Sequence, residues 1–165
     1  MKHMNILLCL LATVLLTGCT VGENDAERVA HQWGEAYFNY QFKHALDFST
    51  PESERWLRFA ASNITQADLD ALQKNGQAVV SLDGYYAGSD TTGTAYLNVS
   101  NWLCPDSIGH AGSLQEQATF QVSLVKRDGR WMVRMEGLPR SERQSRDGVA
   151  DRQWGNVLCC YCRQD

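Results

Sequence analysis

Several acid–base groups fall where the chain's predicted strands and helices would face a common interior. Asp83 and Tyr85 stand at the end of one predicted strand, Glu136 ends another, and Tyr37 and Tyr40 lie near the apolar stripe of a predicted helix. A carboxylate buried in an apolar pocket has a raised pKa and can act as a general base. The same positions suit a plain strand end at Asp83 and tyrosines whose hydroxyls meet water at a rim. The sequence therefore leaves the catalytic residues unknown.

Large aromatic side chains offer a second kind of site. A ligand pocket built from them would hold a small apolar molecule, or it would form part of a contact with another envelope protein. Aromatic residues at helical spacing also build ordinary cores, so both interpretations stay open. The candidate pocket residues are Trp33, Tyr37, Trp56, Asp83, Tyr96 and Trp102.

The first nineteen residues carry an export pattern. Lys2 precedes an apolar run over 6–16, which is shorter than the roughly 20 residues that span a bilayer. The run ends in Leu16-Thr17-Gly18-Cys19, which resembles the lipobox of bacterial lipoproteins. The resemblance implies that residues 1–18 are a signal peptide and that Cys19 carries a diacylglycerol, with a further acyl group such as palmitate on the new amino terminus. It implies a cell-envelope protein anchored to a membrane, at the periplasmic face or on the outer membrane and cell surface.

Four further cysteines lie beyond the export pattern. They are Cys104, Cys159, Cys160 and Cys162, and outside the cytoplasm such thiols form disulfides. We expect at most one bridge from Cys104 to the C-terminal cluster, with the pairing left open. Cys104, His110, Cys159 and Cys162 would also suit zinc, but no metal and no cofactor is expected.

Charge excludes one class of partner. Removing residues 1–18, whose only charged member is Lys2, leaves 14 basic against 19 acidic residues and a net charge of −5. Nucleic-acid binding needs a basic patch, so nucleic acid is not expected as a partner.

Helical patterns come first along the chain. A polar tether over 19–24 precedes an apolar stripe at three- and four-residue steps over 26–40. A short helix over 42–48 follows, and Thr50-Pro51-Glu52 signals another. Thr65 and Asp68 form a capping box for a fourth helix, which Asn75-Gly76 closes.

Alternating patterns replace the helical ones after residue 77. Strands are predicted over 78–84, 94–103, 117–126 and 131–136, and Asp128-Gly129 makes a hairpin turn between the last two. Trp131, Val133 and Met135 share one face, which we assign to the core. Residues 139–165 are polar and rich in charge, which predicts a poorly ordered, cysteine-containing tail. Helices followed by antiparallel strands define an α+β fold.

The first helix, the "STPES" turn and the hairpin "LVKRDGRWMVRMEGLP" together resemble the NTF2-like superfamily, in a cystatin-like, DUF4878-type lipoprotein branch. The resemblance covers residues 25–138 and implies a cone in which a curved sheet wraps the helices around a pocket. It implies no particular activity. We expect a non-catalytic binding or accessory module, with a small isomerase- or dehydratase-type enzyme using pocket Asp and Tyr groups as the alternative. Assembly through apolar surface or intermolecular disulfides is a third hypothesis.

Overall fold

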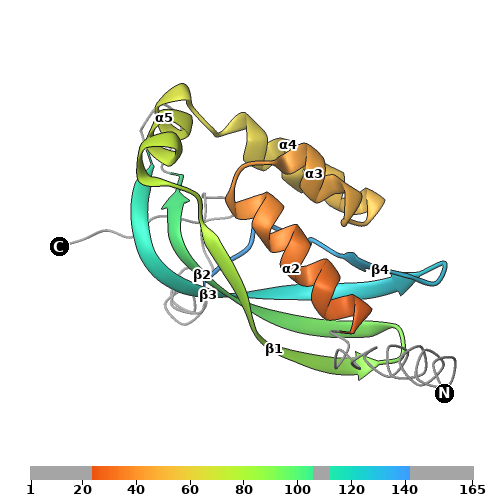
Figure 1. The fold of residues 1–165 in the computed structure, drawn as a ribbon. Coiled ribbons are helices and arrows are strands. Elements are labelled where there is room, and N and C mark those ends of the chain that lie inside the picture. The colour runs from red at the N-terminus through yellow and green to blue at the C-terminus, as the bar shows by residue number, and fades with distance from the viewer. Residues whose placement is uncertain (1–23, 106–111, 142–165) are drawn as a thin grey trace, which may run out of the picture.

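A computed structural model describes residues 24–105 and 112–141 of the 165-residue chain. Within these ranges, four α-helices and a short 3-10 helix precede four strands (Figure 1). The helical elements are α2 (Asp25–Phe38), α3 (Phe42–Asp47), η2 (Pro51–Ser53), α4 (Glu54–Ser62) and α5 (Gln66–Asn75). The strands are β1 (Val79–Ser89), β2 (Thr92–Cys104), β3 (Ser113–Arg127) and β4 (Arg130–Val133).

Local signals explain where the helices begin and end. Asn24 caps α2, accepting hydrogen bonds from the backbone of Ala26 and Glu27, and Glu27 returns the bond in a capping box. The predicted capping box of Thr65 and Asp68 opens α5. Gly76 ends that helix with a φ of 87°, a left-handed conformation that glycine adopts without steric cost.

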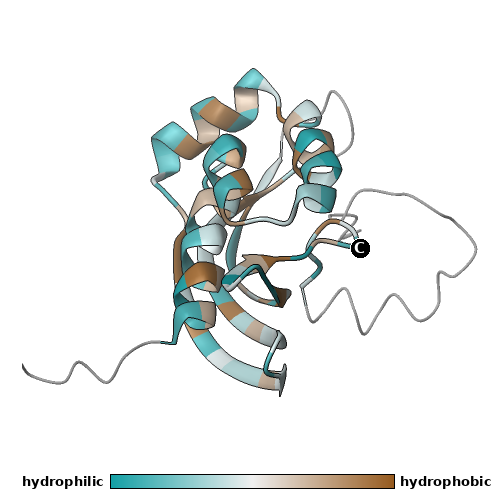
Figure 2. Ribbon diagram, turned by 90° about the vertical axis from the view of Figure 1, so that its right-hand side faces the viewer, coloured by the Kyte–Doolittle hydropathy of each residue, from teal (hydrophilic) through white to brown (hydrophobic). Residues whose placement is uncertain are grey.

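The strands form one antiparallel sheet in the order β1-β2-β3-β4. Figure 1 shows the long strands bending around α2, which lies on the concave side. Alternate residues of β2 and β3, from Ala95 to Val99 and from Phe120 to Leu124, face the helices and are buried. Figure 2 shows the matching alternation of hydrophilic and hydrophobic residues along helices and strands. The core therefore lies between α2 and the concave face of the sheet.

The structure confirms the α+β class, with N-terminal helices packed on a curved antiparallel sheet. The predicted hairpin turn is present, since Asp128 and Gly129 both have positive φ between β3 and β4. Val133 and Met135 are buried as expected, but Trp131 is only half-buried, with the Lys126 ammonium 5.8 Å from its ring centre. None of the helices in the described ranges is both long and apolar enough to cross a bilayer.

Candidate functional site

The last strand separates from the sheet soon after the hairpin. Val133 still pairs with Leu124, and the Arg134 N–H donates to the Ser123 carbonyl at 2.9 Å. The next N–H, that of Met135, points to the opposite side of the chain and donates to the Ser53 hydroxyl oxygen at 2.9 Å. This bond attaches the chain to the start of α4, and the strand itself ends at Val133.

A buried group of hydroxyls fixes this exit. The Ser53 hydroxyl lies 2.9 Å from that of Thr50, and the Thr50 N–H donates to the Val133 carbonyl at 2.9 Å. The Trp33 indole N–H donates to the Ser49 hydroxyl at 3.0 Å, and that hydroxyl donates to the Ala45 carbonyl at 2.7 Å. Each bond satisfies a polar group that burial would otherwise leave without a partner. The path of the chain after β4 is thus set by α2 and by the 49–53 turn.

The departing chain rejoins β3 further along. Ser141 is buried and forms an isolated antiparallel bridge with Phe120. Between this bridge and Val133, residues 134–140, which we call the strap, stand away from the strand. Pro139 lacks an N–H and cannot donate to a sheet ladder, which favours such a break.

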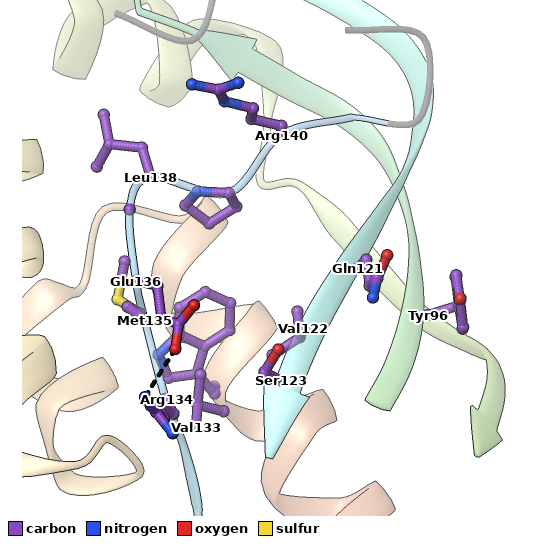
Figure 3. A pocket seen from close by; sticks show the side chains of 13 residues that line it. Tyr96, Gln121, Val122, Ser123, Val133, Arg134, Met135, Glu136, Leu138 and Arg140 are labelled. Atoms are coloured by element: carbon purple, nitrogen blue, oxygen red, sulfur yellow. Dashed lines mark ion pairs between the residues drawn. The ribbon is translucent and has the colours of Figure 1, made fainter. Parts of the chain in front are cut away.

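A pocket of about 620 Å³ occupies the gap between the strap and β3 (Figure 3). This volume lies within the range of small-molecule sites, roughly 300–1,000 Å³. We call it the edge pocket. Its lining comprises Trp33, Tyr96, Gln121, Val122, Ser123, Val133, Arg134, Met135, Glu136, Gly137, Leu138, Pro139 and Arg140.

The edge pocket has an apolar floor and a charged rim. Trp33, Val133 and Met135 belong to the buried core and form the floor. On the rim, the guanidinium of Arg134 and the carboxylate of Glu136 form an ion pair at 2.8 Å, drawn as a dashed line in Figure 3. Arg140 stands on the strap beyond Leu138 and forms no ion pair with the described residues. The rim therefore has one positive charge in excess, beside amide and hydroxyl groups from β3.

A second, narrower pocket lies on the other side of the strap. Its volume is about 50 Å³, and it is lined mainly by aromatic and aliphatic side chains from α2, α4, β2 and β3. Leu138 and Pro139 line both pockets, so the strap separates them. Trp102 lines the narrow pocket, and its buried indole N–H has no hydrogen-bond partner in the structure.

The six predicted pocket residues separate into different places. Trp33 and Tyr96 line the edge pocket, whereas Tyr37 and Trp102 line the narrow apolar one. Asp83 is exposed and lies in a shallow hollow of the sheet that Tyr96 also borders. Trp56 is half-buried on α4 under the Arg55 guanidinium and lines neither pocket. Only pairs of the six are thus brought together.

The candidate acid–base groups are kept apart. Among the described residues, no hydrogen bond or ion pair joins Tyr40, Asp83, Tyr85 and Glu136 to one another. The Tyr40 hydroxyl donates to the Leu103 carbonyl at 2.8 Å. Burial, and then the negative charge of Asp68, raises the pKa of Tyr40 well above its ordinary value. Burial also raises the pKa of Tyr85. Both tyrosines therefore stay protonated at neutral pH, and the Tyr40 hydroxyl acts as the donor to Leu103.

The cysteine predictions fall mostly outside the described ranges. Cys104 is buried at the end of β2 and is disulfide-bonded. Cys159, Cys160 and Cys162 lie outside the described residues, as do His110 and the lipid-site Cys19, so the pairing of Cys104 stays a prediction. Within those ranges, no cluster of three His, Cys, Asp or Glu side chains could hold a metal ion.

Sequence reasoning missed most of the edge pocket. Arg134, Arg140, Gln121 and Ser123 were not singled out, and Glu136 was considered only as a base. One signal was present, because "GLP" at 137–139 follows the predicted strand over 131–136 and cannot continue a sheet ladder. The bond from Met135 to Ser53 joins residues 82 positions apart, and no local pattern announces it.

No protein-family model and no curated protein sequence matches this chain. Several solved structures are similar to this chain, including the following three. An NTF-2 like protein of unknown function from Shewanella oneidensis MR-1 has 10% identity and a TM-score of 0.46, over 67% of this chain and 92% of that one. A de novo designed protein with a curved β-sheet has 13% identity and a TM-score of 0.38, over 68% of this chain and 99% of that one. An NTF2-like protein involved in plasmid conjugation has 12% identity and a TM-score of 0.36, over 69% of this chain and 46% of that one.

The fold of the described residues is α+β, with N-terminal helices packed on one antiparallel sheet. The elements themselves carry this statement, with helices first and a bent meander sheet wrapped around α2. The similarity scores are low, and the likeness concerns architecture alone.

Proposed function

We propose that this chain is a non-catalytic binding module of the cell envelope, held to a membrane by a lipid on Cys19, whose ligand is a small organic anion with an apolar portion. The edge pocket carries the proposal. It combines a core-derived apolar floor with a rim on which Arg140 is not neutralised by a described carboxylate.

Each part of such a ligand would have a defined place. Methylene groups would lie against Leu138 and Pro139 of the strap and against the small exposed part of the floor, and each buried CH₂ contributes about 0.8 kcal/mol. A carboxylate would meet the Arg140 guanidinium, and hydrogen bonds to charged groups contribute about 1.5–3 kcal/mol. Association costs at least several kcal/mol in lost translational and rotational freedom, which offsets part of these gains. We therefore expect short ligands of this class to bind with dissociation constants near or below about 1 mM.

The enzyme alternative has less support. An isomerase or dehydratase of this fold would need a desolvated carboxylate facing a tyrosine or histidine. Asp83 is exposed, and Glu136 is exposed and paired with Arg134. Neither carboxylate is within hydrogen-bond contact of Tyr40 or Tyr85 in the described part of the chain.

Binding of octanoate tests the proposed ligand class. Octanoate should bind the full chain at least tenfold more tightly than 1-octanol, measured by calorimetry, because only the acid offers a charge to Arg140. Arg140→Gln should remove this preference, and Arg130→Gln on the exposed hairpin is the matched control and should keep it. Equal affinity for acid and alcohol, or an undiminished preference in Arg140→Gln, would refute the proposed site.

The anchor is tested separately. Cys19→Ala should abolish fatty-acid labelling of the chain in cells and leave the precursor uncleaved, because the thioether forms on this thiol. Labelling that persists in the variant would contradict the lipoprotein proposal and leave the pocket proposal standing.

A further inference from the structure

The paired outward positions of three strands on the convex face of the sheet, opposite the helices, carry no charge, and the Asp83 carboxylate at the bulge of β1 borders them. Outward-facing residues of β1, β2 and β3 lie beside one another in rows across the strands. In one such row Gly84 pairs with Tyr96, and Tyr96 pairs with Gln121. Charged residues make up 21% of the chain, yet none occurs in these rows. We call this surface the outer face: Val79, Ser81, Gly84, Tyr86, Thr94, Tyr96, Asn98, Ser100, Gln117, Thr119, Gln121 and Ser123.

The side chains of Tyr86 and Tyr96 lie on the outer face close to Gly84. Tyr86 is 68% exposed, and its ring meets that of Tyr96 edge-on with centroids 5.6 Å apart. Gly84 lies beside Tyr96 in the register and has no side chain to fill the space between the rings. A hollow of about 290 Å³ results, lined by Asp83, Gly84, Tyr86 and Tyr96. The hollow therefore offers aromatic surface with a carboxylate at its border.

Amide groups continue the face beyond Tyr96. The Gln117 amide nitrogen donates to the Asn98 side-chain oxygen at 2.8 Å. This bond fixes both side chains and leaves the Asn98 amide nitrogen as a donor and the Gln117 oxygen as an acceptor, side by side. Ser100 and Thr119 add hydroxyls in the same rows. These rows thus present donors and acceptors without a cation, and the Asp83 carboxylate lies at the border of the hollow.

We propose that the outer face binds a neutral oligosaccharide. Sugar rings carry C–H faces that pack on aromatic rings, and their adjacent hydroxyls each donate and accept hydrogen bonds, which matches tyrosines beside amides and hydroxyls. The lack of cations disfavours nucleic acids and acidic polymers as occupants. The lack of an apolar patch disfavours a lipid surface. The outer face shares Tyr96, Gln121 and Ser123 with the lining of the edge pocket. Its ligand is a different one, because the tyrosine hollow and the pair of amides lie outside that pocket and require neither Arg140 nor the strap.

Calorimetry of the full chain with cellotetraose, maltotetraose and chitotetraose tests the proposal. At least one tetrasaccharide should bind with a dissociation constant at or below about 1 mM. Tyr86→Ala should weaken that binding about three- to tenfold, the range that corresponds to the loss of one aromatic contact. Phe59→Ala is the matched control. Phe59 is an aromatic residue of α4, outside the sheet, and is 46% exposed. Its removal should leave tetrasaccharide binding unchanged.

Asn98→Ala gives an independent readout, because it removes the amide pair and leaves both tyrosines. It should weaken binding without lowering the melting temperature, since Asn98 faces outward. The proposal is overturned if no tetrasaccharide binds at about 10 mM, or if Tyr86→Ala and Asn98→Ala both bind as the unaltered chain does. It is also overturned if light scattering shows a dimer that Tyr86→Ala dissociates, because the face would then be a protein interface.

Discussion

Replacing Ser53 with alanine should loosen the strap and destabilise the fold. The Ser53 side chain is fully buried, and its hydroxyl oxygen accepts the Met135 N–H at 2.9 Å. In Ser53→Ala that N–H stays buried without an acceptor, and an unsatisfied buried polar group costs about 1–3 kcal/mol. A domain of this size has only about 5–15 kcal/mol of unfolding free energy, so we expect a loss of about 2 kcal/mol, a large fraction of the total.

Urea unfolding followed by tryptophan fluorescence measures this loss. The midpoint should fall while the slope stays unchanged, because the surface exposed on unfolding is the same. Ser62→Ala is the control, since Ser62 is exposed and donates only to the Phe59 carbonyl within its own helix, and it should stay within about 0.5 kcal/mol. Octanoate affinity should fall in Ser53→Ala and not in Ser62→Ala. A Ser53→Ala protein with unaltered unfolding free energy and octanoate affinity would show that the hydroxyl does not hold the strap.

Two further predictions concern packing and pH. Gly34→Ala should lower the unfolding free energy by about 1–3 kcal/mol, because an added Cβ would lie 2.6 Å from the buried Leu97 side chain. Gly137→Ala is the control and should leave the unfolding free energy unchanged, because its added Cβ would have no atom within 4 Å. A hydrogen bond from Arg127 lowers the pKa of Glu52 from 4.5 to about 2. Because the folded pKa lies below the unfolded one, this contribution to stability is present above pH 4.5 and is lost as the pH falls toward 2. A carboxyl titration by NMR should therefore move up toward 4.5 in Arg127→Gln, and an unchanged midpoint would contradict this cause.

The local features of the fold could be predicted from the sequence because their causes are local. The capping box of Thr65 and Asp68 and the hairpin at Asp128-Gly129 each depend on residues within a few positions of one another. Hydrophobic periodicity assigned the faces of β2 as far as Ser100 and of β3 from Ala118 to Leu124 correctly, since alternation and burial have the same period there. It failed in part at Trp131, because the short β4 lies at the edge of the sheet, where an inward side chain is only half covered.

The candidate site was harder to predict because it depends on where the chain leaves the sheet. Trp33 was assigned to a pocket, but its place in the floor follows from its bond to Ser49 and from the exit of the strap, both set by tertiary contacts. Tyr37 stacks on Trp33 with ring centres 4.8 Å apart, yet it lines the other pocket. The sequence identifies the aromatic residues that could line a pocket. Which of them line the same pocket depends on the path of the strap, which separates the two pockets.

Amide chemical-shift mapping with octanoate shows directly whether the edge pocket binds an amphipathic anion. The shifts should concentrate on the strap, residues 134–140, and on Gln121 and Ser123 across the gap. Arg140→Gln should suppress them. Shifts confined to the narrow pocket around Trp102, or no shifts at octanoate concentrations of about 10 mM, would contradict binding at the edge pocket.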